Sequence, residues 1–140
     1  MKFSETLRVS DWEAATRDPV ALIRCIPGVQ SVEAVEANSY RLQAVNGIGP
    51  VRLKLQGTAR ISAPEPRTLV ADVTLQEPIA GTIYGTFRLK AEEGGIALDA
   101  DVTLGGRLGE FAQPLLRKKA DETVKGFQKN LEALVASLPR

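Results

Sequence analysis

Few side chains in this sequence are suited to nucleophilic or acid–base chemistry. The 140 residues include no histidine and a single cysteine, Cys25. This composition excludes Ser-His-Asp and Cys-His catalytic sites, His-ligated zinc and an imidazole base. One cysteine cannot form an intrachain disulfide. Because no histidine can activate its thiol, we expect Cys25 to be a small buried apolar side chain rather than a reactive group.

Acid–base chemistry would therefore have to come from Asp, Glu, Lys or Tyr, and the candidates are Glu5, Tyr40 and Tyr84. Glu5 falls among the apolar positions of an alternating segment, so it is either buried, or paired with an arginine or solvated at the end of a sheet. Tyr84 falls at an outward position, which makes it a poor catalyst. No P-loop or dinucleotide-binding fingerprint is present. We therefore predict no catalytic residue, no metal site and no cofactor, with a cyclase-type or hydrolase-type enzyme as the less favoured alternative.

The composition indicates a globular protein without a nucleic-acid partner. Hydrophobic residues make up 44% and charged residues 25% of the chain, and the length fits one domain over residues 1–140. Lys plus Arg number 18 and Asp plus Glu 17, whereas nucleic-acid binders normally carry a basic excess. No apolar run is long enough to span a bilayer, and the N-terminal "MKFSETLRVS" has no signal core. We expect a cytoplasmic protein.

Strands are the elements that would hold most of these residues in place. Seven segments have strand-like patterns, most with apolar and polar residues in alternation, which is typical of an antiparallel sheet with one wet face. They are residues 2–9, 29–36, 39–46, 51–61, 68–76, 82–90 and 96–104.

Helices are expected before and after this series of strands. Two short helices should follow the first strand, the second of them beginning at Asp18-Pro19 and ending at Pro27-Gly28. After Gly105-Gly106 the apolar period changes from two to about 3.6, which predicts a long amphipathic C-terminal helix. Pro114 lies inside this pattern, so we expect a kink or a separate first turn there.

These elements predict an α+β fold in which one antiparallel sheet curls around the C-terminal helix, the element available to cover its apolar face. Many inward positions of the sheet carry small residues. They are Ala44, Gly57, Ala59, Ala71, Gly85 and Ala100. Two interpretations stay open: a hollow interior, or small residues that let the helix approach closely.

Five features, in order and spacing, resemble the CoxG family of carbon monoxide dehydrogenase subunits, within the SRPBCC, START and Bet v 1-like superfamily. They are Trp12 six residues before Asp18-Pro19, "CIPGVQSVE" at 25–33, "GIGPVRLKLQG" at 47–57, "DADVTLGGRL" at 99–108 and "FQKNLEALV" at 127–135. The resemblance implies a helix-grip fold: a seven-stranded antiparallel sheet around a long C-terminal helix, two short helices after the first strand, and an apolar cavity.

The resemblance also implies a function. It favours a non-catalytic protein that binds a hydrophobic small molecule such as a lipid, quinone or isoprenoid, as an accessory to a molybdenum-type carbon monoxide dehydrogenase or a related oxidoreductase. The alternative is an adaptor or maturation factor that docks on a larger enzyme or a membrane surface, for which the basic segment Arg117–Lys119 is the candidate. Relatives with membrane tails continue beyond the long helix, whereas this sequence ends at Arg140, so we expect membrane contact to be peripheral at most.

The candidate ligand-binding residues are apolar and lie on the sheet, on the C-terminal helix and at a rim formed by the short helices. They are Leu42, Leu55, Ile83, Phe87 and Leu98 from the sheet, Phe111, Leu115 and Phe127 from the helix, and Trp12 and Ile26 at the rim. The corner at 24–28, the turn at 46–50 and the start of the C-terminal helix are either ordinary turns or the entrance to the cavity.

Overall fold

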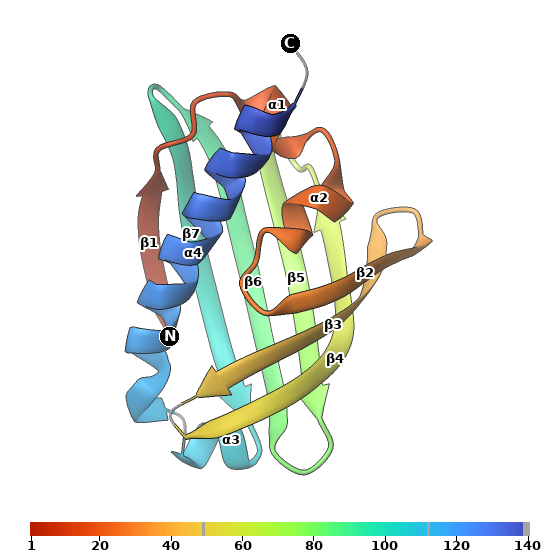
Figure 1. The fold of residues 1–140 in the computed structure, drawn as a ribbon, viewed down its shortest axis with the longest axis vertical. Helices are drawn as coiled ribbons and strands as arrows, with labels where there is room; N and C mark the ends of the chain where they lie inside the picture. Colours follow the sequence, from red (N-terminus) through yellow and green to blue (C-terminus); the bar gives the residue numbers. More distant parts are fainter. Residues whose placement is uncertain (49, 112, 139–140) are drawn as a thin grey trace.

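A seven-stranded antiparallel sheet curves around one long helix in the computed structural model, which describes residues 1–48, 50–111 and 113–138 (Figure 1). The strands are β1 (Lys2–Leu7), β2 (Val29–Glu36), β3 (Ser39–Ile48), β4 (Val51–Ser62), β5 (Thr68–Glu77), β6 (Gly81–Glu92) and β7 (Gly95–Gly105). The helical elements are α1 (Trp12–Thr16), α2 (Pro19–Arg24), α3 (Arg107–Phe111), the 3-10 turn η1 (Gln113–Leu115) and α4 (Leu116–Ser137). This arrangement confirms the predicted α+β helix-grip fold.

The first strand of the chain pairs with the last strand of the chain. The strand order is β1-β7-β6-β5-β4-β3-β2, so β1 and β2 form the two edges. Leu98 of β7 lies opposite Leu89 of β6 and opposite Glu5 of β1. Because alternate residues of a strand share a face, this register puts the apolar positions of β6 and β7 on the concave side, toward α4.

The two short helices begin at aspartates. The Asp11 side chain accepts a hydrogen bond from the backbone N–H of Ala14 at 3.1 Å, and Asp18 accepts one from Val20 at 3.0 Å. Both contacts satisfy N–H groups that have no partner within the helix. Pro19 occupies the first turn of α2, where its missing N–H costs nothing.

The C-terminal helical region is divided at Pro114, as the sequence predicts. α3 ends at Phe111, η1 contains Pro114, and the 22-residue α4 begins only at Leu116. Proline lacks the N–H that a continuous helix would need, and it disfavours helical geometry in the preceding residue. The helical phase before Pro114 therefore does not carry over into α4.

The interior consists of three apolar clusters. The first lies under α1 and the C-terminal half of α4 and includes Trp12 and the fully buried Leu131. The second lies under α2 and includes Ile23 and Leu42. The third lies under α3, around the fully buried Leu108.

The third cluster is separate because β4 bends away from β5. Pairing between these strands covers only Gln56–Ser62 of β4, and a Cβ atom at Gly57 would collide with the backbone of Thr74. Leu53 and Leu55 lie before this bend and pack with Leu108 rather than under α4.

Candidate functional site

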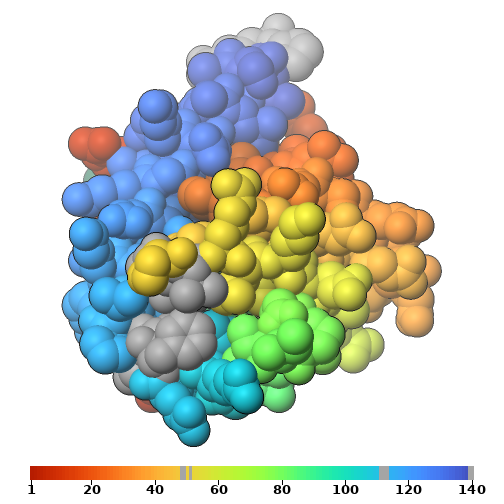
Figure 2. Space-filling view, turned by 60° about the horizontal axis from the view of Figure 1, so that its bottom comes forward, coloured from red at the N-terminus to blue at the C-terminus, as the bar shows by residue number. Residues whose placement is uncertain are grey.

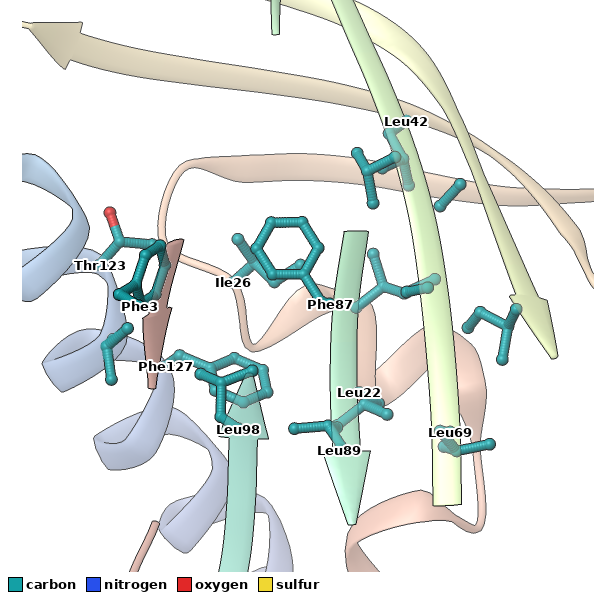
Figure 3. A pocket seen from close by; sticks show the side chains of 16 residues that line it. Phe3, Leu22, Ile26, Leu42, Leu69, Phe87, Leu89, Leu98, Thr123 and Phe127 are labelled. Carbon is teal, nitrogen blue, oxygen red and sulfur yellow. The ribbon is translucent and has the colours of Figure 1, made fainter. Parts of the chain in front are cut away.

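The concave face of the sheet and the helices α2 and α4 enclose a cavity of about 140 Å³ (Figure 3). Its walls come from β1, β3 to β7, α2 with Ile26 in the turn after it, and α4. The lining residues are Phe3, Leu22, Ile23, Ile26, Leu42, Ala59, Ile61, Leu69, Ala71, Val73, Phe87, Leu89, Leu98, Thr123, Val124 and Phe127.

This lining is almost entirely hydrocarbon. Of the 16 side chains, Thr123 is the one with a polar atom. Phe3 and Thr123 lie together at one end of the cavity, and the hydroxyl oxygen of Thr123 points away from the apolar side chains (Figure 3). A polar group brought into the interior would lose its hydrogen bonds to water without replacement. The cavity therefore suits an apolar group.

Small side chains leave this space unfilled. Ala59 of β4 and Ala71 of β5 both line the cavity, and Ala71 lies opposite the larger Phe87 of β6. Of the two interpretations of the small inward residues, the structure therefore shows the hollow interior.

Five of the ten sequence-predicted ligand-binding residues come together around the cavity. They are Ile26, Leu42, Phe87, Leu98 and Phe127. Leu42 and Leu98 are buried on the inner face of the sheet, as their phase predicts.

Leu55 and Ile83 face inward but do not line the cavity, which corrects the prediction for both. They belong to the cluster under α3, because the bend of β4 separates that end of the sheet from α4. Alternation identifies the face of a strand that is buried, but not the element that covers it.

Trp12 and Leu115 also lie elsewhere than predicted. Trp12 is buried in the cluster beneath α1 rather than at the rim. Leu115 is 38% exposed, because it belongs to η1, whose phase differs from that of α4. Phe111 is the last residue of α3, and its side chain lies outside the described part of the structure.

Several lining residues were missing from the prediction. Phe3 occupies an inward position of the first strand, and Val124 lies three residues before Phe127 on the same helical stripe. Both patterns were visible in the sequence. Leu22 and Ile23 come from α2, and no periodicity in so short a helix identifies the side that faces a cavity.

The residues considered for acid–base chemistry lie far apart in the fold. Glu5 is exposed on β1, Tyr40 is buried in the cluster under α2, and Tyr84 is 50% exposed on the outer face of the sheet. None of the three lines the cavity. Within the described ranges, no three Cys, Asp or Glu side chains are grouped to hold a metal ion.

Cys25 is a buried structural residue in a corner that packs against α4. Its thiol donates to the carbonyl of Ala21 at 3.4 Å, and burial raises the pKa of the thiol. The Asn130 side chain donates to the Cys25 carbonyl at 2.8 Å. The corner is thus attached to the long helix by a partly buried hydrogen bond.

Pro27 and Gly28 complete this corner. A Cβ atom at Gly126 of α4 would lie 2.6 Å from Cγ of Pro27, so the absence of a side chain permits the close approach. Gly28 has φ of +91°, and its carbonyl accepts from the Val45 N–H at 2.8 Å. Of the two alternatives for this corner, an ordinary turn or part of an entrance, these contacts favour the ordinary turn. Gly49, in the turn at 46–50 that was a second candidate part of the entrance, lies outside the described residues.

Among the described helices, none is both long and apolar enough to cross a lipid bilayer.

Solved structures with the same fold come from proteins of different kinds. A conserved protein from Geobacillus kaustophilus superimposes with a TM-score of 0.74 at 20% identity, covering 96% of this chain and 92% of that one. A STAR-related lipid transfer protein from Xanthomonas axonopodis gives a TM-score of 0.68 at 12% identity, covering 94% and 84%. The Zhui aromatase/cyclase from a Streptomyces species gives 0.64 at 12% identity, covering 97% and 92%.

At these identities the structures show the fold alone. A search of curated proteins finds no significant match. The family model for CoxG, a carbon monoxide dehydrogenase subunit, matches residues 12–136, from the start of α1 almost to the end of α4. The chain therefore belongs to the CoxG family of carbon monoxide dehydrogenase subunits.

Proposed function

We propose that this protein binds a hydrophobic small molecule in the cavity between the sheet and α4, and that it does so without catalysis. The observation that carries the proposal is a partly open cavity of about 140 Å³ whose 16 lining side chains include one polar atom, the hydroxyl of Thr123. Apolar ligands bind through removal of their surface from water and need few polar contacts. A lipid, quinone or isoprenoid is the expected kind of ligand.

The size of the cavity supports binding rather than a packing defect of no consequence. Engineered apolar cavities of about 150 Å³ stay dry and bind benzene. The lining also supports a non-catalytic role, since its 16 residues include no carboxylate, amine, thiol or imidazole. We further propose that the ligand serves a molybdenum-type carbon monoxide dehydrogenase or a related oxidoreductase, in line with the family to which the chain belongs.

Filling the cavity tests this proposal. Ala71→Leu adds three carbons to a side chain that lines the cavity. Ala97→Leu is the matched control, because Ala97 precedes the cavity-lining Leu98 and so points to the outer face of the sheet. We expect native mass spectrometry to detect a lipophilic molecule that co-purifies with the wild-type protein and with Ala97→Leu but not with Ala71→Leu. A ligand retained equally by Ala71→Leu would place binding outside the cavity.

A second candidate function is docking on a larger oxidoreductase, which the exposed end of the molecule favours. Ile79, in the turn between β5 and β6, is 75% exposed, and Leu115 is 38% exposed. Figure 2 shows this turn beside the segment that leads into α3, and the backbone N–H of Leu108 donates to the carbonyl of Ala80 at 2.8 Å across that contact. Arg117, also exposed, adds positive charge at the start of α4.

The test is co-elution with a purified carbon monoxide dehydrogenase in size-exclusion chromatography. Ile79→Ser should abolish co-elution while Val35→Ser, a change at another exposed apolar residue, leaves it intact. Co-elution unaffected by Ile79→Ser would exclude this end as the docking surface.

A further inference from the structure

A polar groove separates β1 from α4 on the side of the helix away from α2. The groove has a volume of about 790 Å³. Glu5 and Arg8 line it from β1 and the residue after it, and Asp121, Lys125, Gln128 and Lys129 are among the residues that line it from α4.

The groove and the apolar cavity are adjacent at α4. Val124 lines both of them. On β1, Phe3 lines the cavity and Glu5 lines the groove, two residues further along the same face of the strand. Thr123 stands beside Phe3 at this end of the cavity, with its hydroxyl turned away from the apolar interior (Figure 3). The lining thus changes from hydrocarbon in the cavity to mostly polar side chains in the adjacent groove.

The cavity is too small to enclose a whole lipophilic metabolite. A space near 140 Å³ corresponds to one benzene-sized group, by comparison with the engineered cavity of about 150 Å³ that binds benzene. A longer ligand must extend out of the cavity, and the adjoining groove of about 790 Å³ has the room for the remainder.

We propose that the groove between β1 and α4 is the entrance to the cavity and holds the oxygen-bearing polar end of an amphipathic ligand, whose apolar end occupies the cavity. This inference rests on the proposed binding function and specifies its ligand class: a molecule with a terminal ring or short branched hydrocarbon and an anionic or strongly hydrogen-bond-accepting group at the other end.

Lys125 and Lys129 are the groups that recognise the polar end. Arg8 is already engaged, since its Nε lies 3.9 Å from a carboxylate oxygen of Glu132 and its backbone N–H donates to Gln128 at 3.1 Å. The two lysines are four residues apart on α4, a spacing at which like charges repel. Each ammonium group offers three donors and no acceptor. A carboxylate between them would relieve the repulsion and accept from both.

The carboxylates of Glu5 and Asp121 also line the groove. With Arg8, Lys125, Lys129 and Glu132 they balance three positive against three negative charges. Long-range attraction of anions is therefore not expected, and recognition depends on direct contact. This separates the groove from a generally basic surface, at which any anion would bind in proportion to its charge.

A pair of ligands that differ at one end tests the inference. 4-Phenylbutyrate and n-butylbenzene share a phenyl ring and a hydrocarbon chain, but only the first carries a carboxylate. The double variant Lys125→Glu/Lys129→Glu changes the groove, and Arg117→Glu/Lys118→Glu makes the same change of charge at exposed positions of α4 that do not line it. Affinities are measured by titration calorimetry, after thermal melting has shown that each variant is folded.

We expect the groove variant to bind 4-phenylbutyrate at least about tenfold more weakly than the wild type does, which corresponds to about 1.4 kcal/mol, and to bind n-butylbenzene within about twofold of the wild type. The control variant should bind both ligands as the wild type does. Equal loss of both ligands in the groove variant, or wild-type affinity of that variant for 4-phenylbutyrate, would overturn the inference. The proposed function would still stand, because the wild type would bind n-butylbenzene. If the wild type bound neither ligand, the proposed function would fail and this inference with it.

A second measurement does not depend on the variants. In amide NMR spectra of the wild type, 4-phenylbutyrate should shift residues 5–8 and 125–129, whereas n-butylbenzene should leave these amides nearly unchanged. Shifts confined to the corner around Pro27 would place the entrance on the other side of α4 and overturn the inference.

Discussion

The two flanks of α4 are held in different ways. On the flank toward α2, Pro27 packs onto Gly126, and Asn130 donates to the Cys25 carbonyl at 2.8 Å. On the flank toward β1, the attachments are an exposed hydrogen bond from Arg8 to Gln128 at 3.1 Å and an exposed ion pair from Arg8 to Glu132 at 3.9 Å. The flank toward α2 is closed by a close apolar contact and a partly buried hydrogen bond, whereas the polar contacts on the other flank are solvated and lie outside the buried Leu7 of β1.

This difference follows from the positions along the helix. Gly126 and Asn130 are four residues apart and form a stripe toward the corner, whereas Asp121, Lys125, Gln128 and Glu132 form a stripe toward β1. Exposed ion pairs contribute little to stability, typically under about 1 kcal/mol. Opening between β1 and α4 should therefore require less free energy than opening at the corner, and each prediction below tests one part of that comparison.

The largest loss in the free energy of unfolding should come from a change on the side of α4 that faces the sheet, between the two flanks. Phe127 lines the cavity and packs against the cluster that contains Leu131. Phe127→Ala should lower the free energy of unfolding by about 3 kcal/mol, because it removes an aromatic ring from a partly buried site. Denaturation in urea provides the measurement.

Gln128→Ala is the matched control, since Gln128 is the next residue and faces β1. Losing its exposed hydrogen bond from Arg8 should cost about 0.5 kcal/mol. Similar losses for the two variants would mean that the β1 flank is as firmly held as the interior.

The second prediction concerns the close contact at the corner. Gly126→Val places a branched side chain where even a Cβ atom would lie 2.6 Å from the Pro27 ring. Because Pro27 is part of a rigid turn, the contact cannot relax easily, and we expect a loss of about 2 kcal/mol in the free energy of unfolding. Lys125→Val, on the β1 flank, should change it by about 0.5 kcal/mol or less. Equal effects at both positions would contradict the difference between the flanks.

The contacts at these flanks mark the limit of what the sequence could predict. Strand-like patterns in seven segments and the change of period after Gly105-Gly106 predicted the sheet and the long helix, and alternation in most of these segments predicted which face of the strand is buried. A shift of one residue would move every side chain of a strand to the opposite face. Leu42 and Leu98 are on the inner face because the alternation of apolar and polar residues fixes which side of each strand is buried. The family resemblance added the helix-grip arrangement and the cavity, which composition alone left open.

The predictions were wrong for residues whose burial depends on which element covers them, rather than on which face of a strand or helix they occupy. Glu5 shares the inward face of β1 with Phe3, yet it is exposed because α4 leaves a groove beside it. Leu55 faces inward but lies before the bend of β4 at Gly57. Leu115 is exposed because Pro114 resets the helical phase. The groove and the bend depend on how elements far apart in the sequence pack against one another, and a local sequence pattern does not predict that packing.

A smaller effect is expected from the hydrogen bond that ties the corner to α4. Asn130→Ala leaves the Cys25 carbonyl without its side-chain donor and should cost about 1 kcal/mol. Glu132→Ala removes the exposed ion pair with Arg8 and should cost about 0.5 kcal/mol or less. Thermal melting of both variants gives the comparison, which would fail if Glu132→Ala proved the more destabilising change.

The smallest effect should appear as a dependence of stability on alkaline pH. Burial at the corner raises the pKa of the Cys25 thiol in the folded protein above its value in the unfolded chain. The neutral thiol is therefore favoured by folding, and this contribution is complete below the unfolded pKa and declines as the pH rises above it, from about 8.5. The free energy of unfolding of the wild type should fall more between pH 7 and pH 10 than that of Cys25→Ala, in which no thiol titrates. Lysines and tyrosines titrate in the same range, so the informative quantity is the difference between the two pH profiles. Parallel profiles would show that water reaches the thiol in the folded state, and thus that the corner is as open as the flank toward β1.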